Sequence, residues 1–369
     1  MLNLHVNNLN ISKSEFNKIL PVFSYSIATF FLMDFAFFIE DIVTTLHFSY
    51  IESFILLGIP FIGRMVTPFI YSYAGRIGVP RLALLSITIM ALISFGMGYE
   101  TTFAELFASR FMIGVFFGLA TSASIEVSSI TADRKVIGLT MGGWAIGWLL
   151  GAIFFMLLGS WELVSIAGII FAPALLFSRK HNVISPMLQK FHFNFSLKVF
   201  IIFLLGFTPA YVLEIVPSYL GTSSFIESIA VYSVAVFAYL LLPAMMTRFS
   251  LKKTLFSSLI IVGISGVLFF ATLNLAFAII FTMFGLGVNS LLPIISRNLN
   301  VEADKIGPSM NFSAVAGFIF PVFLPLGNEA LNAAVAVFIA AIFLLIFVAI
   351  EFGKHGSRNI NLKRLFANH

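Results

Sequence analysis

Residues 102–158 read TFAELFASRFMIGVFFGLATSASIEVSSITADRKVIGLTMGGWAIGWLLGAIFFMLL. The stretch holds two long apolar runs, 102–128 and 136–158, joined by a short polar segment that contains Arg134 and Lys135. About 20 apolar residues are enough for an α-helix to cross the hydrocarbon core of a bilayer. The stretch therefore predicts two membrane-spanning helices with a basic turn between them.

The rest of the chain continues this pattern. Of its 369 residues, 60% are hydrophobic and 10% are charged, and the mean hydropathy is +1.04. Soluble domains carry about 25% charged residues, so the composition excludes a soluble globule. We expect an all-α integral membrane protein with twelve membrane helices, at about 19–40, 51–73, 79–99, 102–128, 136–158, 161–178, 197–219, 224–246, 254–273, 275–296, 306–327 and 330–352.

The basic residues indicate how the chain is oriented. If the twelve runs are threaded alternately across a membrane, all of the 21 Lys and Arg residues except Arg64 and Arg110 fall on one side. The loops of the other side, including residues 41–50, contain none. Because cytoplasmic loops are enriched in Lys and Arg, we expect a plasma-membrane protein with both termini in the cytoplasm. The cytoplasmic segments then include tails at 1–18 and 353–369 and a linker at 179–196, and their basic residues face lipid headgroups rather than nucleic acid.

An internal repeat divides the helices into two sets of six. The segment ADRKVIGLTM (132–141) enters the fifth predicted helix, and ADKIGPSM (303–310) enters the eleventh. Both place a Gly and a Met at the same spacing. We therefore expect two homologous six-helix halves, 19–178 and 197–352, that are related as a parallel repeat.

Three motifs resemble the major facilitator superfamily, and the resemblance covers essentially the whole chain. YSYAGRIGVPR (71–81) is similar to that family's loop between the second and third helices, although Tyr71 and Gly75 stand where the pattern has Gly and Asp. RFMIGVFFG (110–118) resembles the Arg and spaced glycines of the fourth helix. Glu126 and Arg134 resemble the end of that helix in sugar and metabolite proton symporters.

The resemblance implies a secondary transporter that works by alternating access and acts as a monomer. It assigns a cytoplasmic gate to Arg76, Gly78, Arg81, Glu126 and Arg134. In such a fold the first, fourth, seventh and tenth helices line a central cavity, and the third, sixth, ninth and twelfth helices face lipid. These latter four contain no ionisable residue in their predicted cores.

Two ionisable side chains inside predicted helices point to proton coupling. Asp34 and Arg110 lie at similar depths, roughly 9–12 Å below the outer surface, on the first and fourth helices. A charge in the bilayer interior is costly and usually functional. Protonation of Asp34 and the pairing of Arg110 would be coupled. We expect Asp34 to accept the proton and Arg110 to be its counter-ion, which then binds substrate; the alternative is a static ion pair.

Further embedded side chains form the predicted substrate site. Arg64 lies near the middle of the second helix, and its planar guanidinium suits a carboxylate or a phosphate; alternatively it snorkels or pairs with Asp34. Tyr211, Asn289 and Asn311 are neutral candidates in the second half. Two cations against one carboxylate favour a small organic anion as the substrate, carried with a proton.

Other functions remain open or are disfavoured. A sugar or polyol is the nearest alternative substrate, with Tyr211 and Asn289 binding hydroxyl groups, and a membrane protein that binds a ligand without transport is the alternative of another class. The chain has no Cys, no phosphate-binding Gly-rich loop, and its six His residues lie in tails and loops. We therefore expect no enzymatic activity, no cofactor and no metal site.

Gly143, Gly147 and Gly151 are spaced for close helix packing.

The predicted orientation can be tested directly because the chain lacks native cysteines. A cysteine introduced at Thr45, Thr102 or Ser223 should react with an impermeant maleimide added to intact cells. A cysteine at Ser185 or Asn359 should react only after the membrane is permeabilised. The reverse labelling pattern would contradict the predicted orientation.

Overall fold

The computed structural model describes residues 13–33, 39–131, 133–180, 192–213, 225–246, 248–317, 319 and 328–355. The regular elements in these ranges are all helices. The first half contains α1 (Lys13–Met33), α2 (Ile39–Leu46), α3 (Tyr50–Arg64), α4 (Thr67–Ala74), the 3-10 helix η2 (Gly75–Ile77), α5 (Val79–Met97), α6 (Phe103–Thr131), α7 (Arg134–Leu158), α8 (Trp161–Ala167) and the 3-10 helix η3 (Gly168–Lys180). The second half contains α9 (Leu197–Leu213), α11 (Phe225–Met245), α12 (Leu251–Thr272), α13 (Leu275–Asn298), α14 (Ala303–Ser313) and α16 (Glu329–His355).

The described helices confirm a multi-pass membrane protein of the all-α class. Seven of them, α1, α5, α6, α7, α12, α13 and α16, are long and apolar enough to cross a bilayer. The pair α3 and α4 passes the same test only as one span bent by 52°, which makes eight. Parts of the predicted helices 197–219 and 306–327 lie outside the described residues.

A proline explains the bend between α3 and α4. Pro68 has no N–H group, so it cannot donate the usual helical bond to the carbonyl of Arg64, and its ring crowds that carbonyl. The side chain of Thr67 takes over this role, since its Oγ1 donates to the Arg64 carbonyl over 2.7 Å. The predicted helix 51–73 is therefore two helices, and the bend places Arg64 at the end of the first one.

The predicted loop at 41–50 was wrong in part, because α2 occupies Ile39–Leu46. Its apolar residues Ile39, Ile42 and Leu46 recur at helical spacing, and Ile42 is fully buried. The helix is too short and too polar to resemble a membrane span. The remaining loop ends where Ser49 caps α3: its Oγ accepts from the N–H of Glu52 over 3.3 Å, while the Ser49 N–H donates to the Glu52 carboxylate over 2.8 Å.

The predicted helix 161–178 also differs from a single α-helix. It consists of α8 followed by the 3-10 helix η3, which contains Pro173. Large apolar side chains of η3 are exposed, as are side chains of α5, α12 and α16; examples are Leu92, Ile170, Ile264 and Phe343. Exposed apolar side chains of this kind suit contact with lipid, but α7 and α13 also expose such side chains, for example Leu157 and Leu275. The prediction that only the third, sixth, ninth and twelfth helices face lipid therefore stays a prediction.

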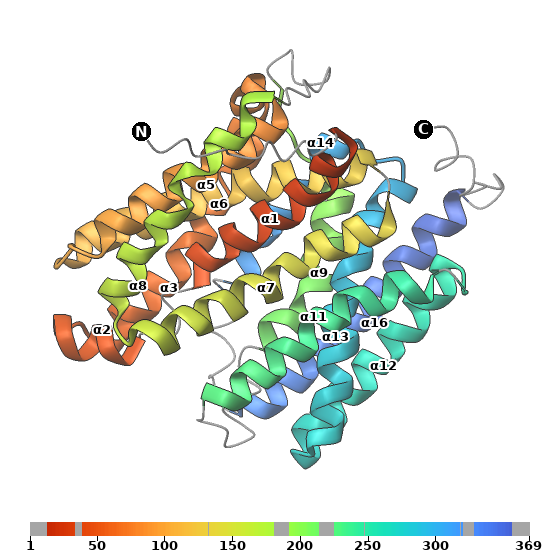
Figure 1. The fold of residues 1–369 in the computed structure, drawn as a ribbon. Coiled ribbons are helices and arrows are strands. Elements are labelled where there is room, and N and C mark those ends of the chain that lie inside the picture. The colour runs from red at the N-terminus through yellow and green to blue at the C-terminus, as the bar shows by residue number, and fades with distance from the viewer. Residues whose placement is uncertain are drawn as a thin grey trace.

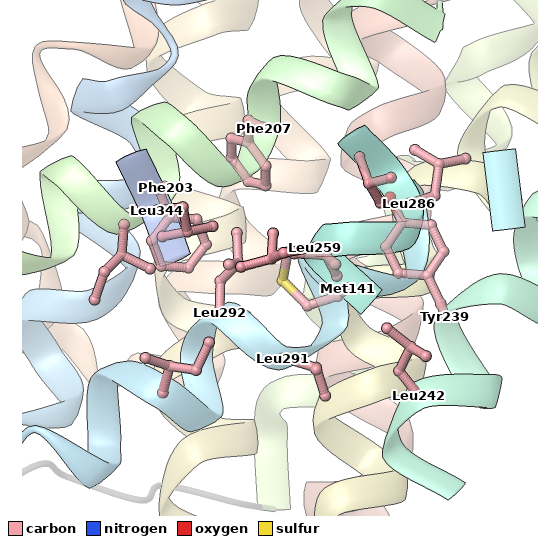
Figure 2. Packing of buried hydrophobic residues seen from close by; sticks show 14 of the residues in the cluster. Met141, Phe203, Phe207, Tyr239, Leu242, Leu259, Leu286, Leu291, Leu292 and Leu344 are labelled. Atoms are coloured by element: carbon pink, nitrogen blue, oxygen red, sulfur yellow. The ribbon is translucent and has the colours of Figure 1, made fainter. Parts of the chain in front are cut away.

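The two halves lie side by side (Figure 1), with α3, α5, α6 and α8 on one side of the view and α11, α12, α13 and α16 on the other. The start of α1 and the end of α16 lie toward the same end of the bundle, called here the terminal end; α2 marks the far end. Apolar packing joins the halves. Figure 2 shows Met141 of α7 among buried side chains of the second half, including Tyr239, Leu291 and Leu292.

Glycines bring the helix backbones close together. A Cβ added at Gly147 of α7 would lie 2.4 Å from the Cβ of Thr29 and 2.6 Å from the carbonyl oxygen of Ser26, both on α1. A Cβ at Gly114 of α6 would lie 2.1 Å from the carbonyl oxygen of Pro60 on α3. In lipid, helices associate through such van der Waals contacts rather than through the hydrophobic effect. The predicted packing role of Gly147 is confirmed.

Replacing Gly147 with Ala should destabilise the protein by about 1–3 kcal/mol, because the added methyl group overpacks the α1–α7 contact. Gly96→Ala is the matched control: its added methyl group meets nothing within 4 Å. Thermal unfolding of the purified proteins in detergent measures the difference. A midpoint for Gly147→Ala equal to that of Gly96→Ala would contradict the packing described here.

Candidate functional site

A cavity lies between the two halves of the chain. The space that its lining encloses, open solvent included, is at most about 320 Å³. Its lining consists of Tyr25 of α1, Arg64 of α3, Met141 and Trp144 of α7, Phe207, Ala210 and Tyr211 of α9, Tyr239 of α11 and Asn289 of α13. A ligand in this cavity would contact both halves.

The lining agrees only in part with the predicted set of helices. The first, seventh and tenth predicted helices do line the cavity, as α1, α9 and α13. No described residue of α6, the predicted fourth helix, is part of the lining, whereas α3, α7 and α11 contribute. The α6 helix instead places the Phe117 ring against Arg64, with the guanidinium carbon 4.5 Å from the ring centroid. It therefore supports the cavity from behind.

Arg64 is the cation of the cavity, and its side chain is only 1% exposed. Its Nε donates to Oδ1 of Asn311 over 2.9 Å, so a residue of α14 in the second half orients it. Besides Phe117, the rings of Phe61 and Trp144 lie 5.7 and 5.9 Å from the guanidinium carbon. Cation–π contacts of this kind stabilise a desolvated cation by about 2 kcal/mol or more. The guanidinium is thus held in one orientation by several neighbours.

Arg64 has no carboxylate partner among the residues that the structure describes. The ion pairs within those ranges involve Asp304, Glu351 and Glu302, and none includes Arg64. A charge in the membrane interior without an opposite charge costs roughly 2.5 kcal/mol or more. The described part of the cavity is therefore positively charged, and an anion would compensate that charge.

Asn311, predicted to bind substrate, contacts the protein instead and is not part of the lining. Its Nδ2 donates to the carbonyl of Gly118 over 3.1 Å and to Oγ of Ser122 over 2.9 Å, both on α6. The same side chain holds Arg64 through Oδ1. Asn311 therefore joins the halves and orients Arg64.

Asn289 and Tyr211, the other neutral candidates, both line the cavity. Asn289 is 1% exposed, and its Oδ1 has no hydrogen-bond partner among the described residues. Its amide lies next to the phenol of Tyr239. Buried polar atoms are nearly always hydrogen-bonded in folded proteins, so the Oδ1 atom of Asn289 is a candidate acceptor for a ligand.

Arg110 lies outside the cavity lining, although it is equally buried at 1% exposure. It donates to three backbone carbonyls: from Nε to Leu56 over 3.3 Å, from Nη1 to Phe31 over 3.3 Å and from Nη2 to Leu32 over 2.8 Å. The Leu56 carbonyl needs such a donor because Pro60, four residues later, has no N–H group. Arg110 thus ties α6 to α1 and α3. Asp34 lies outside the described residues, so its pairing with Arg110 stays a prediction.

The predicted gate residues lie toward the terminal end. Arg76 and Arg81 are exposed, and Gly78 has a φ of 96° that favours glycine at the turn before α5. Glu126 is buried and accepts a hydrogen bond from the hydroxyl of Tyr71 over 2.7 Å. Arg134 donates to the carbonyl of Met246 in the second half over 3.4 Å. The bond from Arg134 to Met246 therefore joins the two halves next to the predicted gate.

The end of the linker forms a second polar cluster, to which the sequence analysis assigned no role. Nε2 of His192 lies 3.1 Å from Oδ2 of Asp304, and Nδ2 of Asn194 donates to the same oxygen over 2.9 Å. The backbone N–H of His192 donates to Oγ of Ser72 over 3.3 Å, and that of Asn194 to the carbonyl of Pro68 over 3.1 Å. Residues 192–194 therefore connect α4 with α14 next to the gate residues.

Several lining residues were missed, namely Tyr25, Met141, Trp144, Phe207, Ala210 and Tyr239. One signal could have found Tyr239. Arg64, Tyr239 and Asn289 each lie four residues before a proline, at Pro68, Pro243 and Pro293. A proline inside a helix frees the carbonyl four residues earlier, and freed backbone groups in membrane helices occur where they line a cavity or find another partner. The apolar lining residues have no comparable signal.

No family model matches the chain, and no curated protein matches it in sequence.

Proposed function

We propose that the chain is a secondary active transporter that carries a small organic anion together with a proton by alternating access. In this proposal the shorter and incompletely described helices also cross the membrane, which gives twelve spans in two halves of six. The protein would lie in the plasma membrane with both termini in the cytoplasm and act as a monomer. The motifs that resemble the major facilitator superfamily support this arrangement.

Arg64 provides the main support for an anionic substrate. It is buried, it lines the cavity, and no described carboxylate neutralises it. A carboxylate could form two parallel charge-assisted hydrogen bonds with a guanidinium. Substrate binding would then supply the opposite charge that the site lacks, while Asn311 keeps the guanidinium oriented.

The position of the cavity supports alternating access. At its far-end side, the rings of Phe61 on α3 and Tyr211 on α9 meet with centroids 6.2 Å apart. Toward the terminal end, Gly307 of α14 packs so closely on α6 that an added Cβ would lie 2.4 Å from Cα of Ser122. Each contact joins one half to the other. Alternating access would require the two contacts to separate in turn, so they are suited to belong to alternating gates.

The position of Arg110 supports a role for Asp34 in proton coupling. Arg110 donates to the carbonyls of Phe31 and Leu32. These residues lie three and two positions before Asp34 in the sequence. Protonation of Asp34 would change the charge near Arg110 and thereby the contacts that hold α1, α3 and α6 together. Because α1 and α3 both line the cavity, such a change could reach the substrate site.

A neutral sugar or polyol is the second candidate substrate. The unused acceptor of Asn289 and the phenols of Tyr25, Tyr211 and Tyr239 favour it, because hydroxyl groups could bind to all four. A protein that binds a ligand without transport would use the same cavity. Uptake into proteoliposomes separates that alternative from a transporter.

Arg64→Ala should weaken binding of a carboxylate by about 10- to 150-fold, because a charge-assisted bidentate contact of about 1.5–3 kcal/mol is lost. Arg64→Lys should recover part of the affinity, since it keeps the charge without the planar fork. A thermal-shift screen of carboxylates and sugars selects the ligand, and calorimetry on the folded variants measures its affinity. Arg248→Ala, which removes an exposed arginine outside the predicted gate and the cavity lining, is the control and should bind as tightly as the parent protein.

Unchanged carboxylate affinity in Arg64→Ala would refute the anion site. If a sugar is the only ligand found, and its affinity falls in Asn289→Ala but not in Arg64→Ala, the sugar alternative replaces the anion.

Asp34→Asn should abolish the acceleration of uptake by an imposed pH gradient and leave substrate exchange intact. The reason is that an amide resembles the protonated carboxyl group but cannot release a proton. Proteoliposome uptake with and without the gradient, beside counterflow exchange, measures both activities. Full gradient-driven uptake by the variant would exclude Asp34 as the coupling residue.

A further inference from the structure

Residues 192–196, called here the strap, lie where the linker ends and α9 begins. Their backbone is bonded to α4 of the first half. The N–H group of His192 donates to Oγ of Ser72 over 3.3 Å, and the N–H group of Asn194 donates to the carbonyl of Pro68 over 3.1 Å. The main chain of the strap is therefore held on the first half.

The side chains of the same two residues are bonded to the second half. Nε2 of His192 lies 3.1 Å from Oδ2 of Asp304 on α14, and Nδ2 of Asn194 donates to that oxygen over 2.9 Å. The α14 helix lies toward the terminal end of the bundle (Figure 1). His192 and Asn194 therefore each bond to both halves, and separation of α4 from α14 would break one bond of each.

Aromatic side chains of the strap also contact both halves. The ring of Phe193 lies 5.0 Å from the ring of Phe69 on α4, measured between centroids. The ring of Phe195 lies 5.4 Å from the ring of Phe312 on α14. Aromatic rings attract one another at such distances. Polar and apolar contacts of the strap thus both connect α4 with α14.

The carboxylate of Asp304 makes this connection sensitive to protonation. Its side chain is 1% exposed, and a buried carboxylate is costly unless an opposite charge pairs with it. Among the described ion pairs, the one that includes Asp304 is formed with His192. An ionised carboxylate only accepts hydrogen bonds, so this contact needs a proton on Nε2. One tautomer of the neutral ring supplies that proton, but only the protonated ring also supplies a positive charge.

The other charged groups of the second half around this pair do not change their charge in the range where a histidine normally does, about pH 5 to 8. Nζ of Lys305 lies 2.7 Å from Oε2 of Glu302, and this hydrogen bond lowers the pKa of Glu302. Glu302 also interacts electrostatically with His192. Nη1 of Arg297 donates to a backbone carbonyl over 3.0 Å, and its charge acts on Asp304. Lys, Arg and a Glu with a lowered pKa all stay ionised over this range.

Two further titratable groups lie in the first half. The hydroxyl of Tyr71 on α4 donates to Oε2 of Glu126 on α6 over 2.7 Å, and Tyr71 also interacts electrostatically with Asp304. The bond between Tyr71 and Glu126 lies within the first half. Of all these groups, His192 is therefore the one that changes charge near neutral pH and whose pairing crosses from one half to the other.

We propose that the strap is a pH-sensitive connection between the halves, in which protonation of His192 strengthens its pairing with Asp304 and holds the terminal end closed. Because the closed arrangement binds that proton more tightly than the separated one, acid favours closure. The proposal goes beyond the proposed function, and only its consequence for transport rests on it. In a symporter that releases protons on this side, acid there would slow further uptake.

Distances between spin labels test the proposal without a substrate. The chain has no native Cys, so labels can be attached to cysteines introduced at Ile77 in the first half and Lys253 in the second half, both exposed. The predicted orientation places both positions on the cytoplasmic side. Pulsed electron resonance on the purified full chain measures the fraction of molecules with widely separated labels, at about pH 8 and at about pH 5. We expect this fraction to be about fivefold smaller at the lower pH, because a neutral hydrogen bond becomes a charge-assisted one.

His192→Gln keeps a side chain that can donate a hydrogen bond but cannot become charged. The fraction of separated molecules in this variant should be the same at both pH values. Asp304→Asn removes the opposite charge and should also abolish the pH dependence, which provides a second variant if the first does not fold. His47→Asn is the control, since His47 is exposed between α2 and α3 and its φ of 55° is one that asparagine tolerates. It should keep the pH dependence of the parent protein.

Equal distance distributions of the parent protein at both pH values would overturn the proposal, and this comparison needs no further variant. A pH dependence that persists in His192→Gln or in Asp304→Asn would also overturn it and would assign the response to another group, such as Glu126. Neither outcome touches the proposed function, which is tested by Arg64-dependent binding and by uptake. Conversely, absence of uptake beside a pH-dependent strap would refute the proposed function and leave this proposal standing.

Discussion

The absence of water from the interior of a bilayer is the constraint on which the rest of this structure depends. Backbone and side-chain polar groups there must find partners within the protein. Prolines inside the helices make this harder, because each one leaves a carbonyl four residues earlier without its usual donor. Two such carbonyls have described partners: Arg110 donates to the carbonyl of Leu56, and Thr67 donates to the carbonyl of Arg64. These bonds fix α3 against α6 and set the bend that exposes Arg64 to the cavity.

The same constraint explains why two buried arginines have different surroundings. Arg110 donates to three carbonyls of α1 and α3, one from each nitrogen of its guanidinium group. Arg64 has one amide partner and three aromatic neighbours, and no described carboxylate. The first arrangement is that of a side chain that holds helices together. The second arrangement leaves the positive charge of Arg64 without a described opposite charge, in a cavity that both halves line.

The contacts around Arg64 link binding to the relative position of the halves. Asn311 belongs to the second half, yet it bonds to Arg64 and to the backbone and side chains of α6 in the first half. Phe61, one turn from Arg64, contacts Tyr211 of the second half. A movement that separates the halves therefore changes the surroundings of the guanidinium. In a transporter, this would make the affinity for substrate depend on which side of the cavity is open.

Much of the fold could be predicted from the sequence, because the length and apolarity of a membrane helix are local properties. The sequence by itself determined the all-helical membrane class, the basic turn between α6 and α7 and the close packing at Gly147. It also identified Arg64, Asn289 and Tyr211 as polar residues inside predicted membrane helices. The sequence did not reveal α2, because its eight residues are too few to show a clear helical pattern and were predicted as part of a loop. It also did not reveal the break at Pro68. Only the tertiary structure decided that Arg110 bonds to carbonyls, that Asn311 orients Arg64, and that Tyr25, Trp144 and Tyr239 line the cavity. The physical reason is that these roles depend on which faces of distant helices meet, and hydropathy shows that a residue is buried without showing what it is buried against.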